Sequence, residues 1–184
     1  MVYCGIDLSL TATGVAILKD ADGSDFKVIS KLIQTKPSDH SNKWVRIKFI
    51  VDQIKDFINT HDAKYVILED YIISQINITT TTKLVEVGAC VRMMLNDMNM
   101  PFMTVVGSQL KKYITGTGSS KKSSILKDLY KLYNVDVDDD NEGDAIVLAM
   151  MCRDVAEKLT PDKKYQEAVI KKIIKTREHY NWTM

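Results

Sequence analysis

The sequence is poor in cysteine, and the few cysteines it has are far apart. Its 184 residues include 3 cysteines, Cys4, Cys90 and Cys152, and no Cys-x-x-Cys pair. An odd and scattered set argues against a disulfide framework and against a zinc finger, and it favours a reducing, cytoplasmic location. The length suits one domain with its own hydrophobic core.

Long hydrophobic runs are also absent. No apolar stretch approaches the ~20 residues of a membrane span, and the first residues, MVYCGID, lack the basic segment of a signal peptide. We therefore expect no membrane partner. The net charge of +1 gives no strong excess of either sign and identifies no partner by itself.

Charge is nevertheless segregated along the second half of the chain. Six lysines and one acid lie between Lys111 and Lys131, six acids and no base lie between Asp136 and Asp144, and the chain is basic again from Lys163 to Arg177. The basic stretches are suited to a polyanion and the acidic stretch to metal ions. The alternative is that these residues form the solvated faces of helices and a loop.

Hydrophobic periodicity predicts the element order βββαβαβααα. The predicted strands are 2–8, 14–18, 26–33, 64–69 and 102–106, with an Asp22-Gly23 turn before the third. The predicted helices are 42–59, 80–98, one that follows Ser119, 141–159 and 162–178. In the first helix, the buried stripe is expected to be Trp44, Ile47, Val51, Ile54 and Ile58. Three hairpin-linked strands followed by two crossovers predict an α/β fold, a mixed five-stranded sheet flanked by helices.

Three acids fall where chemistry concentrates in such a sheet. Asp7 interrupts the first strand, Glu69 closes the fourth, and Asp144 opens the apolar run DAIVLAM. If the first and fourth strands are neighbours, these carboxylates converge and require a cation, and oxygen-only ligation favours Mg²⁺ or Mn²⁺. Each acid also has a structural alternative, as a turn residue, a strand-end residue or part of a helix cap.

Four segments resemble the RuvC family of Holliday-junction resolvases, which have an RNase H-like fold. They are GIDLSLTATGVAIL, VILEDYI, LKKYITGTGSSKKSSI and NEGDAIVLAM, and they occur in the family's order between Val2 and Val155. The third is the most specific, because its two lysines flank a Gly-x-Gly turn ahead of a helix. A short, divergent chain suits a phage-encoded member, which would act in the host cytoplasm.

The resemblance implies roles for individual residues. Asp7, Glu69 and Asp144 would be catalytic ligands of two Mg²⁺ or Mn²⁺ ions, and Lys122 would stabilise charge at the scissile phosphate. Further DNA contacts are implied at Lys111, Lys112, Gly116, Gly118 and Lys121. Lys111 and Lys122 match the functional lysines of the family. Lys112 and Lys121 are their neighbours in sequence and could exchange roles with them.

Two positions depart from the family pattern. The fourth metal ligand is usually an acid or histidine three residues before the last Asp, where this chain has Asn141. Its amide oxygen could still reach a metal, or Asp140 could supply the charge instead. The family also places a base-stacking aromatic at the position of Ile72. Here Tyr71 could stack on a base, or Ile72 could act as an apolar wedge.

The predicted function is a structure-selective endodeoxyribonuclease that resolves four-way DNA junctions as a homodimer, with symmetric nicks and no nucleotide cofactor. Residues 1–160 would form the nuclease domain, and 161–184 a basic helical extension of it. One alternative is a related nuclease for flaps, branched DNA or ribosomal RNA precursors. Others are an actin- or sugar-kinase-like ATPase, because GIDLSLTATG is similar to that superfamily's phosphate loop, and a junction-binding module without activity.

Overall fold

A mixed β-sheet runs through the centre of the molecule. The computed structural model describes residues 1–20, 26–71, 78–175, 179–180 and 182, without the side chains of 78–80 and 179–180. The predicted Asp22-Gly23 turn lies outside these residues. The strand order is β3-β2-β1-β4-β5-β6. The strands are β1 (Val2–Asp7), β2 (Ala12–Asp20), β3 (Phe26–Gln34), β4 (Tyr65–Asp70), β5 (Phe102–Val106) and β6 (His179–Tyr180).

The strand pairing confirms the predicted RNase H-like sheet. Strands β1 to β3 form an antiparallel meander, and β1 pairs in parallel with β4, which pairs in parallel with β5. The two-residue β6 is an addition that the sequence did not predict, and it pairs antiparallel with β5. Ile6 lies opposite Leu68, so Asp7 and Glu69 follow at the same edge of the sheet.

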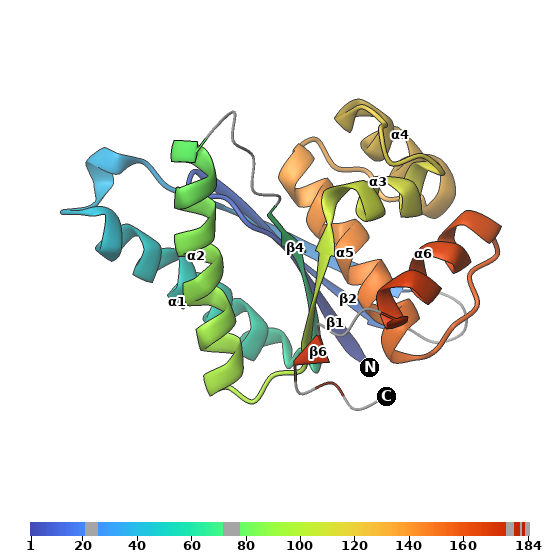
Figure 1. Ribbon diagram of the computed structural model, residues 1–184, viewed down its shortest axis with the longest axis horizontal. Helices are drawn as coiled ribbons and strands as arrows, with labels where there is room; N and C mark the ends of the chain where they lie inside the picture. Colours follow the sequence, from blue (N-terminus) through green and yellow to red (C-terminus); the bar gives the residue numbers. More distant parts are fainter. Residues whose placement is uncertain (21–25, 72–77, 176–178, 181, 183–184) are drawn as a thin grey trace.

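Helices cover both faces of the sheet (Figure 1). Helices α1 and α2 pack on one face with a core that includes Ile6, Ile50 and Val91. Helices α3 to α6 share the other core, which includes Tyr3, Leu110 and Ile146. The helices are α1 (Lys43–His61), α2 (Ile78–Asp97), α3 (Gly107–Thr115), α4 (Lys122–Tyr133), α5 (Asp140–Ala156) and α6 (Lys164–Lys175), and a short 3₁₀ turn, η1 (Pro37–Asp39), precedes α1.

Two glycines let α5 lie directly on the sheet. A Cβ atom added at Gly5 in β1 would collide with the carbonyl oxygen of Ala145 and the amide nitrogen of Ala149. At Gly14 in β2 it would collide with the carbonyl oxygen of Asn141. Backbone therefore touches backbone at both places, and this contact fixes the first three turns of α5 over β1 and β2.

Three expectations about the helices are corrected by the structure. Helix α3 was not predicted, and α5 ends at Ala156 rather than near residue 159. Trp44 does not join the buried stripe, because it lies in the first turn of α1 and its side chain is 59% exposed. The Asn42 side chain caps that turn, and the Lys43 ammonium lies 4.6 Å from the centre of the indole ring.

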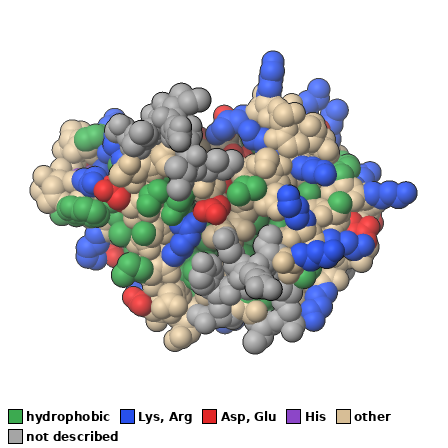
Figure 2. Space-filling view, viewed as in Figure 1, with side chains coloured by type: hydrophobic (Ala, Val, Ile, Leu, Met, Phe, Trp, Pro, Cys, Tyr) green, Lys and Arg blue, Asp and Glu red, His purple; other side chains and the backbone are tan. Residues whose placement is uncertain are grey.

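On the face of the molecule drawn in Figure 2, Lys and Arg side chains are unevenly distributed. Figure 2 shows Lys and Arg side chains concentrated over the helices α3, α4 and α6, whereas hydrophobic side chains are more frequent over α1 and α2. Within the described part of the chain, no helix has both the length and the apolar character needed to cross a bilayer.

Candidate active site

Three carboxylates from three different elements converge at the edge of the sheet. Asp7 ends β1, Glu69 lies in β4, and Asp144 lies in the second turn of α5. One oxygen from each side chain lies within 4.8 Å of the others. The three line a cleft of about 500 Å³ that is open to solvent. Because β1 and β4 are adjacent parallel strands, the side chains at their carboxyl ends meet at one point, as the sequence led us to expect.

Burial and mutual repulsion make this cluster unfavourable without a cation. Burial raises the pKa of Asp7 well above its ordinary value, and the charges of Glu69 and Asp144 raise it further. Burial, then the Glu69 charge, raises the pKa of Asp144 to about 7. Burial also raises the pKa of Glu69. A raised pKa means that ionising these carboxyls costs more free energy in the folded protein than in water, and a nearby positive charge lowers that free energy.

Two lysines line the same cleft as the acids. The Lys122 ammonium, at the first residue of α4, lies 4.0 Å from a carboxylate oxygen of Asp144. Lys111, in α3, also lines the cleft. The charges of both lysines lower the pKa of Glu69 and of Asp144, so both act on the acidic cluster. Half of the Lys122 side chain is exposed, which leaves its ammonium accessible to a phosphate.

The cluster meets the requirements of a divalent-metal site. The Oδ1 atom of Asp144 is buried and has no hydrogen-bond partner among the residues described. A buried carboxylate oxygen without a partner is costly, and a metal ion would satisfy it. The donors are all carboxylate oxygens, the ligands of Mg²⁺ and Mn²⁺ rather than of softer metals.

The structure places the two candidates for a fourth ligand differently. Asn141 lines the cleft, and Asp140, although also described, does not. Asp140 is still near enough for its charge to raise the pKa of Asp144. The N-cap is Asp139, whose side chain accepts hydrogen bonds from the amides of Asn141 and Glu142. Asp144 is therefore free of a capping role.

Of the remaining glycines and lysines predicted to contact DNA, one lies in the cleft and three lie around it. Gly118 lines the cleft, whereas Gly116 ends α3 in a left-handed conformation (φ 83°) and faces the ring of Tyr165. Lys112 and Lys121 are exposed. Ile72 lies outside the described residues, so the proposed wedge has no structural account.

Tyr71 is held beside the acids by residues that the sequence did not indicate. The Arg92 guanidinium lies over the Tyr71 ring, 5.0 Å from the ring centre. Arg92 also forms an ion pair with Asp70 at 2.7 Å. Gly88 on α2 leaves room for both side chains, since an added Cβ would clash with each of them. Nothing near Glu69 in the sequence points to Arg92, which comes from a different element.

Other cleft residues were also missed. Gly107 begins α3 beside Glu69, and a Cβ there would collide with the Glu69 carboxylate. The pattern Leu110, Tyr113 and Ile114 has helical spacing and was the available signal for α3. The cleft residues that were not predicted are Leu8, Asp70, Leu84, Gly107 and Ser108.

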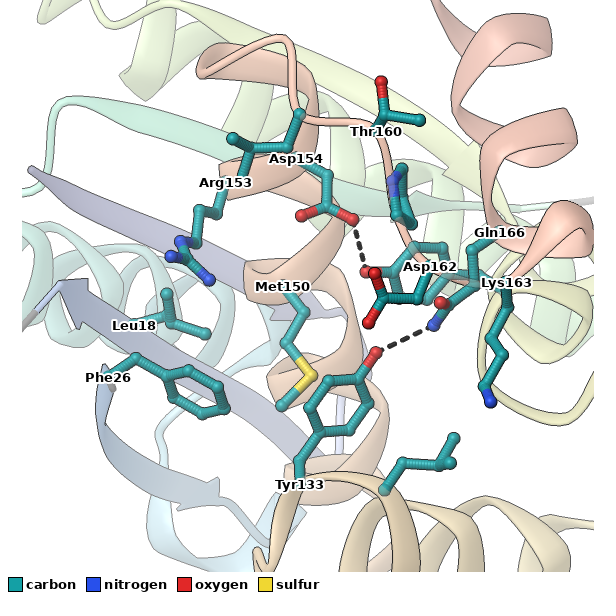
Figure 3. Close-up of a pocket in the computed structure, with 14 residues that line it drawn as sticks. Leu18, Phe26, Tyr133, Met150, Arg153, Asp154, Thr160, Asp162, Lys163 and Gln166 are labelled. Atoms are coloured by element: carbon teal, nitrogen blue, oxygen red, sulfur yellow. Dashed lines mark hydrogen bonds between the residues drawn. The ribbon is translucent and has the colours of Figure 1, made fainter. Parts of the chain in front are cut away.

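A second cavity, of about 320 Å³, lies at the other end of α5. The Tyr113 hydroxyl donates a hydrogen bond of 2.6 Å to Asp154, and Figure 3 shows this bond as a dashed line at the Asp154 carboxylate. Nearby, Gln166 donates to the hydroxyl of Tyr133 at 2.8 Å. These contacts join α3, α4, α5 and α6 around the cavity, whose described lining residues include no group of three converging acids like that of the first cleft.

The fold and the first cleft together define an RNase H-like protein with an acidic cluster suited to divalent metal ions. The sequence profile of the family described as crossover junction endodeoxyribonuclease RuvC matches residues 3–152. The chain therefore belongs to the RuvC family. The match includes all three acids and both cleft lysines, and it ends before α6.

Individual relatives agree with this assignment. The crossover junction endodeoxyribonuclease RuvC of Caldicellulosiruptor saccharolyticus is 28% identical over 154 residues, which are 82% of this chain and 90% of the relative. The RuvC protein of Brachyspira hyodysenteriae is 26% identical over 151 residues, 82% of this chain and 92% of the relative.

Solved structures share the fold. Thermus thermophilus RuvC in complex with Holliday junction substrate superposes with a TM-score of 0.69 at 17% identity, over 82% of this chain and 91% of that one. The yeast mitochondrial Holliday junction resolvase superposes with a TM-score of 0.60 at 9% identity, over 92% of this chain and 80% of that one. At these identities the likeness concerns the fold alone.

Proposed function

We propose that this RuvC-family endonuclease resolves four-way DNA junctions by metal-dependent hydrolysis in the cleft between β1, β4 and α5. The observation that carries the proposal is the convergence of Asp7, Glu69 and Asp144 in a cleft that two lysines also line. The alternative of an actin-like ATPase is wrong, because the family match covers most of the chain.

We propose two divalent ions, Mg²⁺ or Mn²⁺, at this site. Asp7, Glu69 and Asp144 would hold them, and the Asn141 amide oxygen is the preferred fourth ligand because Asn141 lines the cleft. When bound, such ions activate water and stabilise charge on the attacking and leaving oxygens of a phosphodiester.

The chain's own residues position the DNA for this reaction. Lys122 and Lys111 would contact the scissile phosphate, since both line the same cleft as the acids. The negative charge that builds on the phosphate in the transition state would be stabilised by Lys122. The turn at Gly118 lets the backbone approach the DNA closely. Lys112 and Lys121 would contact the flanking backbone.

Tyr71 is the residue that we propose to stack on an unpaired base. It is partly exposed, it lines the cleft, and Arg92 holds its ring from α2. A base stacked on an aromatic ring contributes about 1–3 kcal/mol to binding. This interaction favours substrates with unpaired bases at a branch point.

We also propose a homodimer, because a two-fold protein suits a two-fold junction and symmetric nicks. Exposed apolar residues on α1 and α2 support it, among them Met93, which is 66% exposed, and Val45 and Phe49.

Residues 161–184 are proposed as an extension of the nuclease domain. The three free cysteines, two of them buried, support the predicted cytoplasmic location.

The central test uses Asp7→Asn. The variant should bind a synthetic four-way junction with the affinity of the parent but cut it about 10³-fold more slowly in Mg²⁺ buffer, because a metal ligand loses its charge. Cleavage is followed by the appearance of nicked strands, and binding by fluorescence anisotropy. Retained cleavage by Asp7→Asn would overturn the proposal.

Substrate competition separates the nuclease alternatives. Four-way junction, flap and structured RNA, each with its own label, are offered together to the parent protein in limiting amount. We expect the junction to be cut first. Preferential cleavage of the flap or the RNA would assign the site to a related nuclease, and binding without cleavage at any Mn²⁺ concentration would indicate a junction-binding module.

A further inference from the structure

Helix α6 lies outside the family match and yet packs against the wall of the active-site cleft. The family profile ends at residue 152, and α6 spans Lys164–Lys175. Its apolar side, with Val169, Ile170 and Ile173, is buried in the core shared with α3 and α5. The helix is therefore part of the folded body of the protein, although the family's function does not account for it.

The opposite side of α6 is strongly basic. Five lysines and one acid, Glu167, lie between Lys163 and Lys175. Lys171 pairs with Glu167, whereas no ion pair involves Lys164, Lys172 or Lys175 within the described residues. These three side chains are exposed, and helical spacing places them away from the buried stripe. The surface is thus a row of accessible ammonium groups with little local compensation.

This row continues the positive surface beside the cleft. The Tyr165 ring lies against Gly116, and the turn that begins at Gly116 reaches Gly118 in the cleft wall. Lys112, exposed on α3, and Lys121, exposed at the start of α4, flank the same turn. Figure 2 shows the resulting concentration of Lys and Arg side chains over α3, α4 and α6.

We infer that the basic side of α6, defined by Lys164, Lys172 and Lys175, binds the phosphate backbone of one duplex arm of the junction, beyond the branch point held in the cleft. Ammonium groups on a helix fit a polyanion without regard to sequence. The exposed side of α6 presents Ala168 and lysines. The one aromatic ring of the helix, Tyr165, lies against Gly116 instead of standing free to stack on bases, so duplex backbone fits this side better than a single strand. The inference rests on the proposed function.

The test removes these three charges from the full-length protein. The variant Lys164→Gln/Lys172→Gln/Lys175→Gln should bind a long-armed junction about 10-fold or more weakly, and the slope of log affinity against log salt should become shallower by about 2 to 3. Its cleavage rate at saturating junction should stay at the parent level, because the acids and both cleft lysines are intact. A junction whose arms are shorter than one helical turn should be bound equally by variant and parent.

Two matched variants complete the experiment. Lys164→Arg/Lys172→Arg/Lys175→Arg keeps the charge and should bind like the parent. Lys19→Gln/Lys27→Gln/Lys55→Gln removes the same charge from exposed positions elsewhere, with Lys19 and Lys27 paired at the far end of the sheet from Asp7, and should leave the salt slope unchanged. Circular dichroism melts of all variants monitor α6, whose last turn is stabilised by cations.

The outcomes distinguish this inference from the function on which it rests. An unchanged salt slope in the α6 glutamine variant, or an equal loss in the Lys19, Lys27 and Lys55 variant, overturns the inference while junction cleavage by the parent sustains the proposed function. A parent protein that neither binds nor cuts four-way junctions overturns both.

Discussion

Helix α5 carries a buried aspartate near each end, and the protein treats the two in opposite ways. Asp144 is 6% exposed and Asp154 is 9% exposed. At Asp154, the Tyr113 hydroxyl donates a hydrogen bond of 2.6 Å to the carboxylate. At Asp144, one carboxylate oxygen has no hydrogen-bond partner in the described structure, and two further carboxylates are close.

The difference shows how function can be recognised in a buried acid. Burial raises both pKa values, to about 7 for Asp144 and to about 6 for Asp154. The shift alone therefore does not separate the two. What separates them is hydrogen bonding: Asp154 accepts a bond from Tyr113, whereas the Lys122 ammonium comes only to 4.0 Å from Asp144 and Oδ1 has no partner among the described residues. A buried carboxylate oxygen without a partner is costly to the fold and is retained where a ligand completes it.

The largest expected effect is a contrast between Asp144→Asn and Asp154→Asn. Asp144→Asn should reduce junction cleavage by about 10³-fold, because a metal ligand loses its charge, whereas Asp154→Asn should cut at the parent rate. Without divalent ions and above neutral pH, Asp144→Asn should also raise the free energy of unfolding by about 1 kcal/mol or more, since it removes repulsion. Cleavage assays and urea unfolding measure the two effects. Equal cleavage by both variants would remove the contrast.

The next effect concerns pH and Asp154. Because folding raises the pKa of this acid, its contribution to stability is fully present below its ordinary pKa of 3.8 and is lost as pH rises through about 6. The loss should be about 3 kcal/mol over that window. Urea unfolding of the parent and of Asp154→Asn at a series of pH values measures it, and the difference between the two curves isolates this residue from the other buried acids. If the free energies of unfolding of the parent and of Asp154→Asn change with pH in parallel, Asp154 is not desolvated in the folded protein.

A smaller effect extends the comparison to Asp70, a compensated acid at the edge of the cleft. Its partner Arg92 also holds Tyr71, so Arg92→Ala should free the ring and weaken junction binding by about 3- to 10-fold without abolishing cleavage. Tyr71→Phe, which keeps the ring, serves as the control and should bind like the parent. Junction affinity by anisotropy is the measurement, and unaltered binding by Tyr71→Ala would exclude stacking at this position.

The sheet could be predicted because its strands have strong and local signals. Hydrophobic runs bounded by turns located β1 to β5, and the order of hairpins and crossovers fixed their arrangement. Helix α3 was missed because it has only nine residues, begins with Gly107 and follows Val106, which offers no side-chain cap. The two residues of β6 have no pattern of their own, since pairing with β5 alone makes them a strand.

The acids of the candidate site could also be predicted, because a carboxylate at the end of an apolar strand is conspicuous in sequence. The residues that support them could not. Arg92 reaches Asp70 from α2 only after the helix has packed on the sheet. Gly107 matters because the Glu69 carboxylate occupies the space of its missing Cβ, and that is a fact of three-dimensional packing.

The contact of α5 with Gly5 and Gly14 has a consequence for genetics. The spacing between Asp7 and Asp144 is set where main chain rests on main chain, so no repacking of side chains can absorb an added methyl group. A random screen for inactive alleles would therefore recover alanine at either glycine together with changes to the acids themselves. Such alleles would retain every ionisable group of the cleft. They would be inactive because the distance between Asp7 and Asp144 has changed.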